Sequence, residues 1–261
     1  MKIVSLLENT SSCDELRSEH GLSLYIETEF HKILFDMGQS DLFSENAEVL
    51  GVDLTEVDIA VLSHGHYDHG GGLKKFLEIN KKAPVYIHKY AFEPHFNGTE
   101  KYIGLDTSLK DNPLIIFTED EFEIDENLTL YSCNNRKRTH PVIPSGLNSF
   151  ENGEFIPDDF RHEQYLLIEE KGKNVLISGC SHKGILDITE WFQPDCLVGG
   201  FHFSKLPLDD KLLSFAKELD SYNTRFYTCH CTGTEQYNFM KDEMKDLNYL
   251  SCGETITFPE D

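Results

Sequence analysis

Short apolar runs separated by polar or glycine-containing turns fill the first ninety residues of the chain. Some runs are rich in strand-forming residues, whereas others repeat their apolar positions with a helical period. The pattern therefore predicts strands at 2–7, 22–27, 32–35, 57–62 and 84–88 and helices at 42–50 and 71–79.

The middle of the chain has a different character. From about residue 91 to 161 the sequence is rich in aromatic residues, asparagine, proline and charge, with short strands expected only near 113–117 and 128–132. We interpret 91–161 as an irregular, pocket-shaping insertion within one domain spanning 1–261, with a separate small domain as the alternative. Regular patterns then return as a hairpin at 164–169 and 174–178, helices at 184–192 and 209–219, and strands at 196–198 and 225–228.

The order of these elements predicts the fold class. Strands alternate with helices, which favours an α/β fold, and the paired strands at the start indicate mixed rather than purely parallel sheets. A chain of 261 residues can bury the core of one large α/β domain.

Composition narrows the partners and the compartment. The formal charge of −23, from 23 basic and 46 acidic residues, repels phosphate backbones, so a nucleic-acid partner is not expected. No apolar stretch is long enough for a membrane span, and the opening residues are too short an apolar run for a secretory signal, so we expect a cytoplasmic protein. The odd number of cysteines then favours thiols or metal ligands over disulfides: Cys13, Cys133, Cys180, Cys196, Cys229, Cys231 and Cys252.

Four predicted strands run directly into a histidine. His64 follows 57–62, and His182, His202 and His230 follow the later strands. A single histidine at a strand end is usually a hydrogen-bonded structural residue. Because ligands of α/β sheets gather at the carboxyl ends of strands, four of them predict a common site.

The spacing His64-x-His66-x-Asp68-His69 adds metal chemistry to this position. On an extended loop His64 and His66 project to the same side and can bind one ion, while Asp68 and His69 turn toward a second. Imidazoles with one carboxylate suit zinc, iron or manganese. A polar loop that is rich in histidine by accident is the alternative.

These residues carry a family resemblance. Ser63 to Gly72, after a buried strand, resembles the signature of the metallo-β-lactamase superfamily, and Leu34 to Gly38 resembles its first motif. The resemblance covers nearly the whole chain. Within the superfamily, the chain is similar to the branch that contains metal-dependent hydrolases and a dihydropteroate-synthase-like enzyme of methanopterin biosynthesis. It implies an αββα sandwich, in which two mixed sheets face each other, helices cover the outside and metals lie along one edge.

The same resemblance implies roles for the site residues. His64 and His66 would hold the first of two divalent metal ions, with zinc preferred and iron or manganese as alternatives. The second ion would be held by Asp68, His69 and His230. Asp36 would orient the motif loop by hydrogen bonding rather than bind metal.

The sequence departs from the family pattern at two ligands. Most members have Gly-Asp after the strand at 174–178, where this chain has Gly179-Cys180. We prefer His182 as the additional metal ligand, with Cys180 as an alternative thiolate ligand. His162 is the remaining candidate for the third ligand of the first metal, although the residues around it do not resemble the Pro-Gly-His-Thr segment that is usual in the family.

Two residues are candidates for direct roles in catalysis. Glycines before His202 allow close backbone approach, so His202 is expected to contact substrate or act as a general acid, with a structural role as the alternative. Asp68 is expected to accept a proton during the attack on substrate. Cys229 and Cys231 flank His230 and are expected to point to the opposite face of their strand and pack there.

Three functions remain open at this point. The default is a hydrolase that uses a metal-bound hydroxide on a small-molecule ester, lactone or phosphoester. The first alternative, from the resemblance, is a synthase that joins a dihydropterin pyrophosphate to an aryl amine. The second is a non-hydrolytic metal or redox module, although its diiron members usually have Glu at the position of His66. A flat heterocycle could stack on Tyr90, Phe92, Phe96, Tyr102 or Phe201.

Overall fold

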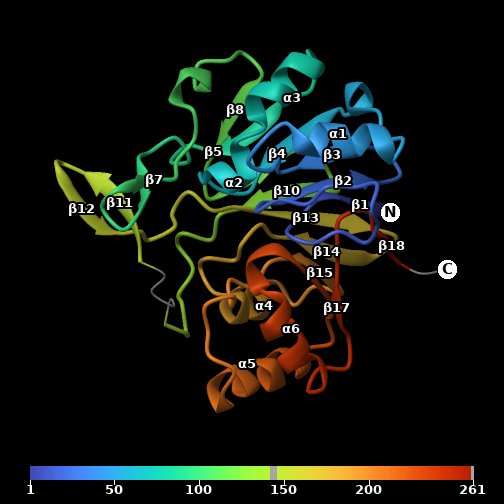
Figure 1. Ribbon diagram of the computed structural model, residues 1–261, viewed down its shortest axis with the longest axis vertical. Coiled ribbons are helices and arrows are strands. Elements are labelled where there is room, and N and C mark those ends of the chain that lie inside the picture. Colours follow the sequence, from blue (N-terminus) through green and yellow to red (C-terminus); the bar gives the residue numbers. More distant parts are fainter. Residues whose placement is uncertain (142–145, 260–261) are drawn as a thin grey trace.

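Two mixed β-sheets form the centre of the molecule. The computed structural model describes residues 1–141 and 146–259, and within these residues each of the two sheets has seven strands (Figure 1). In the first sheet the strands from β3 to β8 run parallel, and the others pair antiparallel. Its order is β18 (Thr255–Thr257), β1 (Lys2–Leu7), β2 (Ser23–Glu27), β3 (Lys32–Phe35), β4 (Ile59–Leu62), β5 (Val85–His88) and β8 (Ile115–Thr118).

The second sheet packs against the first. Its strands from β14 to β17 are parallel, whereas β9, β10, β13 and β14 pair antiparallel. Buried residues of both sheets form one core between them, including Phe35 and Val61 from the first and Ile168 and Val175 from the second. Its order is β17 (Leu247–Tyr249), β16 (Arg225–Thr228), β15 (Cys196–Gly199), β14 (Lys173–Ile177), β13 (Tyr165–Glu170), β10 (Leu128–Tyr131) and β9 (Glu121–Glu123).

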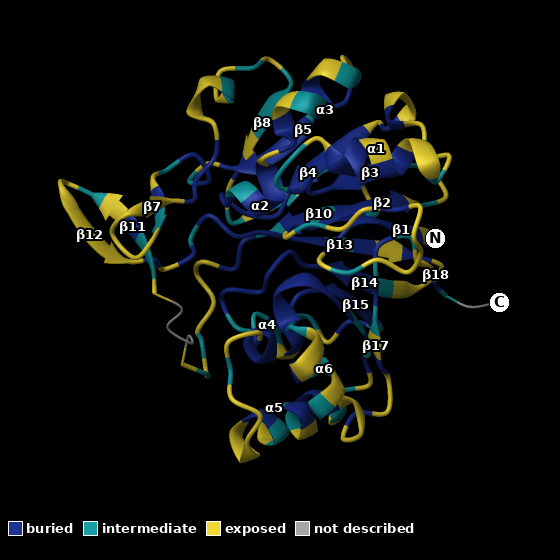
Figure 2. Cartoon of the chain, in the orientation of Figure 1, coloured by how far each residue is buried: buried dark blue, intermediate teal, exposed yellow. Residues whose placement is uncertain are grey.

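Helices cover the outer faces of both sheets, which makes the molecule an αββα sandwich, as the family resemblance implies (Figure 1). The sheets are mostly buried and the helices expose their outer sides (Figure 2). Phe43 and Phe76 are buried in the core between the helices and the first sheet, and Leu212 and Phe226 are buried in the corresponding core of the second sheet. The helices are α1 (Leu42–Val49) and α3 (Leu73–Ile79) on the first sheet, and α4 (Ile185–Phe192), α5 (Asp210–Asp220) and α6 (Thr234–Lys241) on the second.

The region expected to be an insertion at 91–161 is only partly separate from the sheets. It contributes β8 to the first sheet and β9 and β10 to the second, with Leu128 and Leu130 buried in the core between them. The pattern is weak because β8 and β9 are largely half-exposed edge strands. The rest forms a small sheet that projects to one side (Figure 1), in the order β12 (Glu154–Pro157), β11 (Leu147–Glu151), β6 (His95–Asn97) and β7 (Lys101–Tyr102).

Several short elements were not predicted from the pattern. Strands β17 and β18 and helix α6 lie near the carboxyl end, and single turns occur elsewhere. Within residues 1–141 and 146–259, no helix has both the length and the apolar character needed to cross a bilayer. The single turns are η1 (Leu54–Glu56), α2 (Tyr67–Gly70), η2 (Thr107–Leu109) and η3 (His230–Thr232).

Candidate metal centre

The predicted histidines converge on one cavity because of the strand order. The parallel strands β14, β15 and β16 end at one edge of the second sheet, and the loops that follow them carry His182, His202 and His230. The loop after β4 carries the histidine motif to the same edge from the first sheet. The cavity, called the histidine pocket below, has a volume of about 160 Å³ and is lined by His66, Asp68, His182, His202 and His230, among others.

His64, His66 and His182 form the first group, of which His66 and His182 line the pocket. The Nε2 atoms of His64 and His182 lie 3.3 Å apart, and the ring centroids of His66 and His182 are 4.9 Å apart. Nδ1 of His64 is turned away toward Ser63 Oγ at 2.8 Å. One ligand atom from each histidine lies within 4.8 Å of the others, so the three can share a cation.

His69 and His230 form the second group. Their Nε2 atoms are 3.2 Å apart, and Nε2 of His230 lies 3.4 Å from Oδ2 of Asp68. The outer nitrogen of each ring is held elsewhere, Nδ1 of His69 by Asp36 at 2.6 Å and Nδ1 of His230 by Asn9 Oδ1 at 2.8 Å. Each imidazole therefore presents one nitrogen to its neighbour and anchors the other, as metal-ligating histidines do.

The donor set fits divalent metal ions. Burial first, and neighbouring histidines second, hold the pKa of His64 and His182 well below the usual range, so both rings are neutral. Nitrogens bound tetrahedrally at about 2.0–2.1 Å from zinc lie about 3.3 Å from one another. The distances of 3.3 Å and 3.2 Å between facing Nε2 atoms match this nitrogen–nitrogen distance. The Nε2 atom of His66 is buried without a hydrogen-bond partner.

Asp68 remains ionised inside the pocket. Burial raises its pKa, but hydrogen bonds from His20 and His230 and the charge of His69 outweigh burial and hold the pKa well below its usual range. Oδ2 of Asp68 lies 3.1 Å from Nε2 of His20, a half-exposed histidine that the sequence pattern did not single out. At neutral pH Asp68 is therefore a carboxylate that can bind a cation or accept a proton.

Asp36 holds the motif loop from behind. Its Oδ1 accepts the backbone N–H of Ser63 at 2.7 Å, and its Oδ2 accepts the hydroxyl of Ser63 at 2.7 Å in addition to the bond from His69. The contact with Asp36 raises the pKa of His69 against the opposing effect of burial. All three residues are fully buried, so this network orients His69 without touching solvent.

His162 is engaged outside the histidine pocket. Its Nδ1 accepts the backbone N–H of Gly65 at 2.9 Å, and its Nε2 lies 3.3 Å from Asp158, which also accepts Nδ1 of His95 at 2.8 Å. His182 stands opposite His64, whereas His162 belongs with His66, His95 and Asp158 to a second buried group whose ligand atoms lie within 4.8 Å of one another. His162 supports the backbone of the motif loop, and His95 is a second buried histidine that the sequence analysis missed.

Two cysteines, Cys180 and Cys231, line the histidine pocket. Sγ of Cys180 lies 3.2 Å from Nε2 of His69, and burial raises the pKa of the Cys180 thiol well above its usual value. Cys229 packs in the core, but the expectation that Cys231 points away from the site is wrong, because Cys231 lines the pocket. Strand β16 ends at Thr228 and the chain enters the turn η3, so strand alternation no longer applies.

His202 lines the pocket beside His182, with ring centroids 4.3 Å apart. Burial, and then the charge of Lys205, lower the pKa of His202 to about 4. A neutral imidazole can position substrate through a hydrogen bond, but it is a weak general acid near pH 7.

The aromatic residues proposed to stack on a heterocycle lie outside this pocket. None of Tyr90, Phe92, Phe96, Tyr102 and Phe201 is among the described residues that line it. Phe201 is buried in the core against Phe226, and Phe96 packs against Tyr102 on the small sheet. That part of the expectation is not supported by the geometry.

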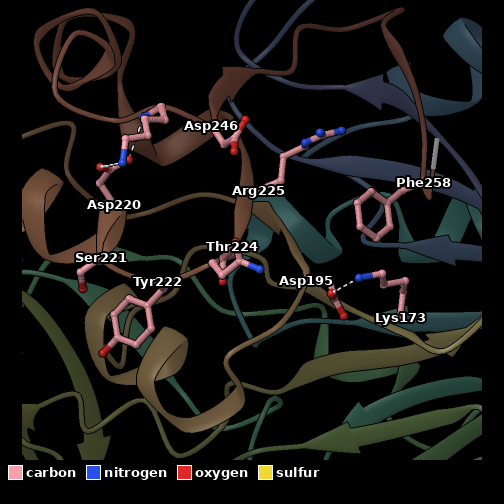
Figure 3. Close-up of a pocket in the computed structure, with 11 residues that line it drawn as sticks. Lys173, Asp195, Asp220, Ser221, Tyr222, Thr224, Arg225, Asp246 and Phe258 are labelled. Carbon is pink, nitrogen blue, oxygen red and sulfur yellow. Dashed lines mark hydrogen bonds and ion pairs between the residues drawn. The ribbon is translucent and has the colours of Figure 1, made fainter.

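A larger cavity lies at the opposite end of the second sheet. It has a volume of about 380 Å³ and is lined by residues at the starts of strands, among them Lys173, Arg225 and Asp246 (Figure 3). Lys173 is paired with Asp195 at 2.6 Å. None of the histidines described above lines this larger cavity. The histidines lie at the carboxyl ends of strands, which are the usual position for chemistry in α/β sheets.

Glu163 is a further residue that the sequence analysis missed. Its two carboxylate oxygens accept the backbone N–H groups of His182 at 2.6 Å and Lys183 at 3.0 Å, and it is fully buried. Replacing Glu163 with glutamine puts an NH₂ group against one of these donors. We expect Glu163→Gln to lower zinc affinity about tenfold or more, as loss of a ligand-orienting partner does, measured by competition with a chelator. Glu169→Gln, exposed on β13, the strand that follows Glu163, is the control, and equal affinities in the two variants would contradict this role.

Acid should destabilise the metal-free protein through its buried histidines. Burial lowers the pKa of His162 to about 4 and that of His88 to about 3, whereas both are near 6.5 in the unfolded chain. Between pH 6.5 and 4 the unfolded state therefore binds more protons than the folded state does. The free energy of unfolding falls as pH falls for this reason. Thermal melts from pH 7.5 to 4.5 should show a declining midpoint below about 6.5, and a flat profile would contradict the neutral histidines.

Comparison with known proteins identifies the family. A sequence profile of the Metallo-beta-lactamase superfamily matches residues 17–218. The chain belongs to this superfamily, and the resemblance found in the motifs is confirmed.

Individual relatives lie within the same family. A curated protein of Methanocaldococcus jannaschii, named 7,8-dihydropterin-6-methyl-4-(beta-D-ribofuranosyl)-aminobenzene-5'-phosphate synthase, is 31% identical over 99% of this chain and 97% of its own. The crystal structure of Tm1679, described as a metal-dependent hydrolase of the beta-lactamase superfamily, is 33% identical, with a TM-score of 0.84 and full coverage of both chains. Zn(2+)-bound PqqB from Methylobacterium extorquens shares the fold at 14% identity and a TM-score of 0.60, covering 99% of this chain and 100% of its own.

Proposed function

We propose that this protein is a metal-dependent hydrolase of a small-molecule ester, lactone or phosphoester. The observation that carries the proposal is the pairwise approach of buried imidazoles, with the Nε2 atoms of His64 and His182 at 3.3 Å and those of His69 and His230 at 3.2 Å. Two lone pairs at this distance repel unless a proton or a cation lies between them. Burial holds His64 and His182 in the neutral form, so a metal cation is a better occupant than a proton between these two rings.

The residues divide into two ligand sets. His64, His66 and His182 would hold one divalent ion. Asp68, His69 and His230, which contact one another, would hold the other, with Cys180 close enough to His69 to join this second set. Zinc is the preferred ion for such a nitrogen-rich set, with iron or manganese as alternatives. When bound, such ions supply Lewis acidity and lower the pKa of a coordinated water toward neutrality.

The chain's own groups then position the reaction. Asp36 and Asn9 fix the rings of His69 and His230 through their outer nitrogens. Asp68, ionised and flanked by His20, is placed to accept a proton, and His202 offers a neutral N–H group to the substrate. The pocket opens between the main sheets and the small sheet, since Asn97 and Leu147 also line it.

A second candidate is a synthase that joins a dihydropterin pyrophosphate to an aryl amine. It is favoured by the 31% identity to the Methanocaldococcus jannaschii synthase along nearly the whole of both chains. In this reaction, metal ions held by the same ligand sets would bind the departing pyrophosphate. The fold and the ligand sets are compatible with both reactions, because one scaffold can host different chemistries.

Two assays on one zinc-loaded sample discriminate between the candidates. The first measures hydrolysis of ester, lactone and phosphodiester reporters, and the second measures condensation of a dihydropterin pyrophosphate with an aryl amine. The proposal expects turnover in the first assay that is lost on chelation and restored by zinc. Condensation alone would replace it with the synthase, and silence in both assays with metal retained would favour a non-hydrolytic metal-binding role.

A further inference from the structure

The entrance of the histidine pocket has a charge opposite to that of the molecule. The chain has 46 acidic and 23 basic residues, yet two lysines, Lys101 and Lys205, line this pocket. Among the described lining residues the only carboxylate is Asp68, which faces His20 and His230 rather than the lysines. A basic entrance in an acidic molecule favours the entry of an anion.

The two lysines come from separate parts of the fold. Lys101 lies on β7 of the small sheet, with its Nζ 3.4 Å from the hydroxyl of Tyr67 and 5.1 Å from the centre of that ring. Lys205 follows β15 and lies close enough to His202 for its charge to lower the pKa of that ring. No carboxylate is paired with either lysine among the described ion pairs, so both ammonium groups are available to a ligand.

The volume of the pocket limits what it can enclose. At about 160 Å³ it is smaller than the roughly 300–1,000 Å³ of pockets that enclose a whole drug-sized ligand. It has room for a compact charged group next to the metal ligands, with the remainder of the substrate outside. Asn97 and Ser204 add side-chain hydrogen-bond donors to the two lysines at this entrance.

We propose that the histidine pocket is selective for substrates that carry a phosphate group, held at the entrance by Lys101 and Lys205. A phosphate presents several oxygens at once, so it can contact ammonium groups on one side and metal ligand positions on the other. This inference rests on the proposed function, because it names the substrate class of the same pocket. It applies equally to a phosphate monoester and to a pyrophosphate.

The test measures binding of inorganic phosphate by calorimetry to the purified full-length protein after zinc loading. Lys101→Gln and Lys205→Gln should each weaken binding about fivefold, and the double variant more than about tenfold, since each removes one charge-assisted hydrogen bond. Lys205→Arg should restore most of the affinity. Lys217→Gln, on α5 and paired with Glu243, is the matched control and should bind as the wild type does.

The outcomes separate this inference from the proposed function. Unchanged phosphate affinity in the double variant would overturn the inference, even if reporter hydrolysis is observed. Malonate binding as tightly as phosphate would also overturn it, because a carboxylate would then serve as well. Weakened phosphate binding in the double variant, with no hydrolysis of any reporter by the wild type, would support the inference and contradict the hydrolase.

Discussion

His64→Ala should lower zinc affinity more than about a hundredfold, beyond the effect of losing a ligand-orienting partner. The substitution removes the nitrogen that faces His182 at 3.3 Å and leaves His66 and His182 as a pair. Reporter hydrolysis at limiting zinc should fall by at least the same factor, because the ion that activates water is no longer held. Chelator competition and initial rates measure the two effects on the same sample.

The control for this loss is a histidine far from the pocket. His31 contacts Asp58 and Asp125 at the surface of the sandwich, so His31→Ala should bind zinc and turn over as the wild type does. Circular dichroism and the melting temperature establish that His64→Ala is folded. A folded His64→Ala protein with wild-type zinc affinity would remove His64 from the ligand set.

Asp36→Ala should affect folding and metal binding together. The substitution leaves the backbone N–H and hydroxyl of Ser63 and Nδ1 of His69 without their acceptor in a fully buried position. We expect a loss of about 4 kcal/mol in the free energy of unfolding, measured by urea denaturation, because each orphaned buried group costs about 1–3 kcal/mol. Zinc affinity should fall about 10- to 100-fold in the fraction that remains folded.

Asp36→Asn separates the two effects of this substitution. The amide keeps one acceptor oxygen and the volume of the side chain but loses the charge, so it should retain more of the unfolding free energy than alanine does. Stability and zinc affinity that are unchanged in both variants would show that Asp36 does not organise the motif loop.

The fold was largely predictable because its signals are local. Strands β4, β14, β15 and β16 are short, apolar and bounded by glycine or polar residues, and each leads to a histidine. The carboxyl ends of parallel strands share one edge of a sheet, so convergence of these histidines followed from the pattern. Elements with mixed exposure gave weaker signals: β8 was expected as a short strand near 113–117 but within an insertion, and β9 was not predicted.

The supporting residues of the site could not be predicted in this way. Asn9 and Glu163 act on His230 and His182 through contacts that only the folded topology creates, and the first of these spans 221 positions. His20 and His95 stand alone in loops or short strands without periodicity. Cys231 was misplaced because the backbone leaves the extended conformation at His230, where φ is 48°, which no pattern of apolar residues records.

Anomalous diffraction at the zinc absorption edge, from crystals of the zinc-loaded protein, tests the metal centre most directly. We expect strong peaks at the histidine pocket, one between the facing Nε2 atoms of His64 and His182 and one between those of His69 and His230. Crystals that hold zinc elsewhere, or a pocket without any anomalous peak at saturating zinc, would contradict this expectation.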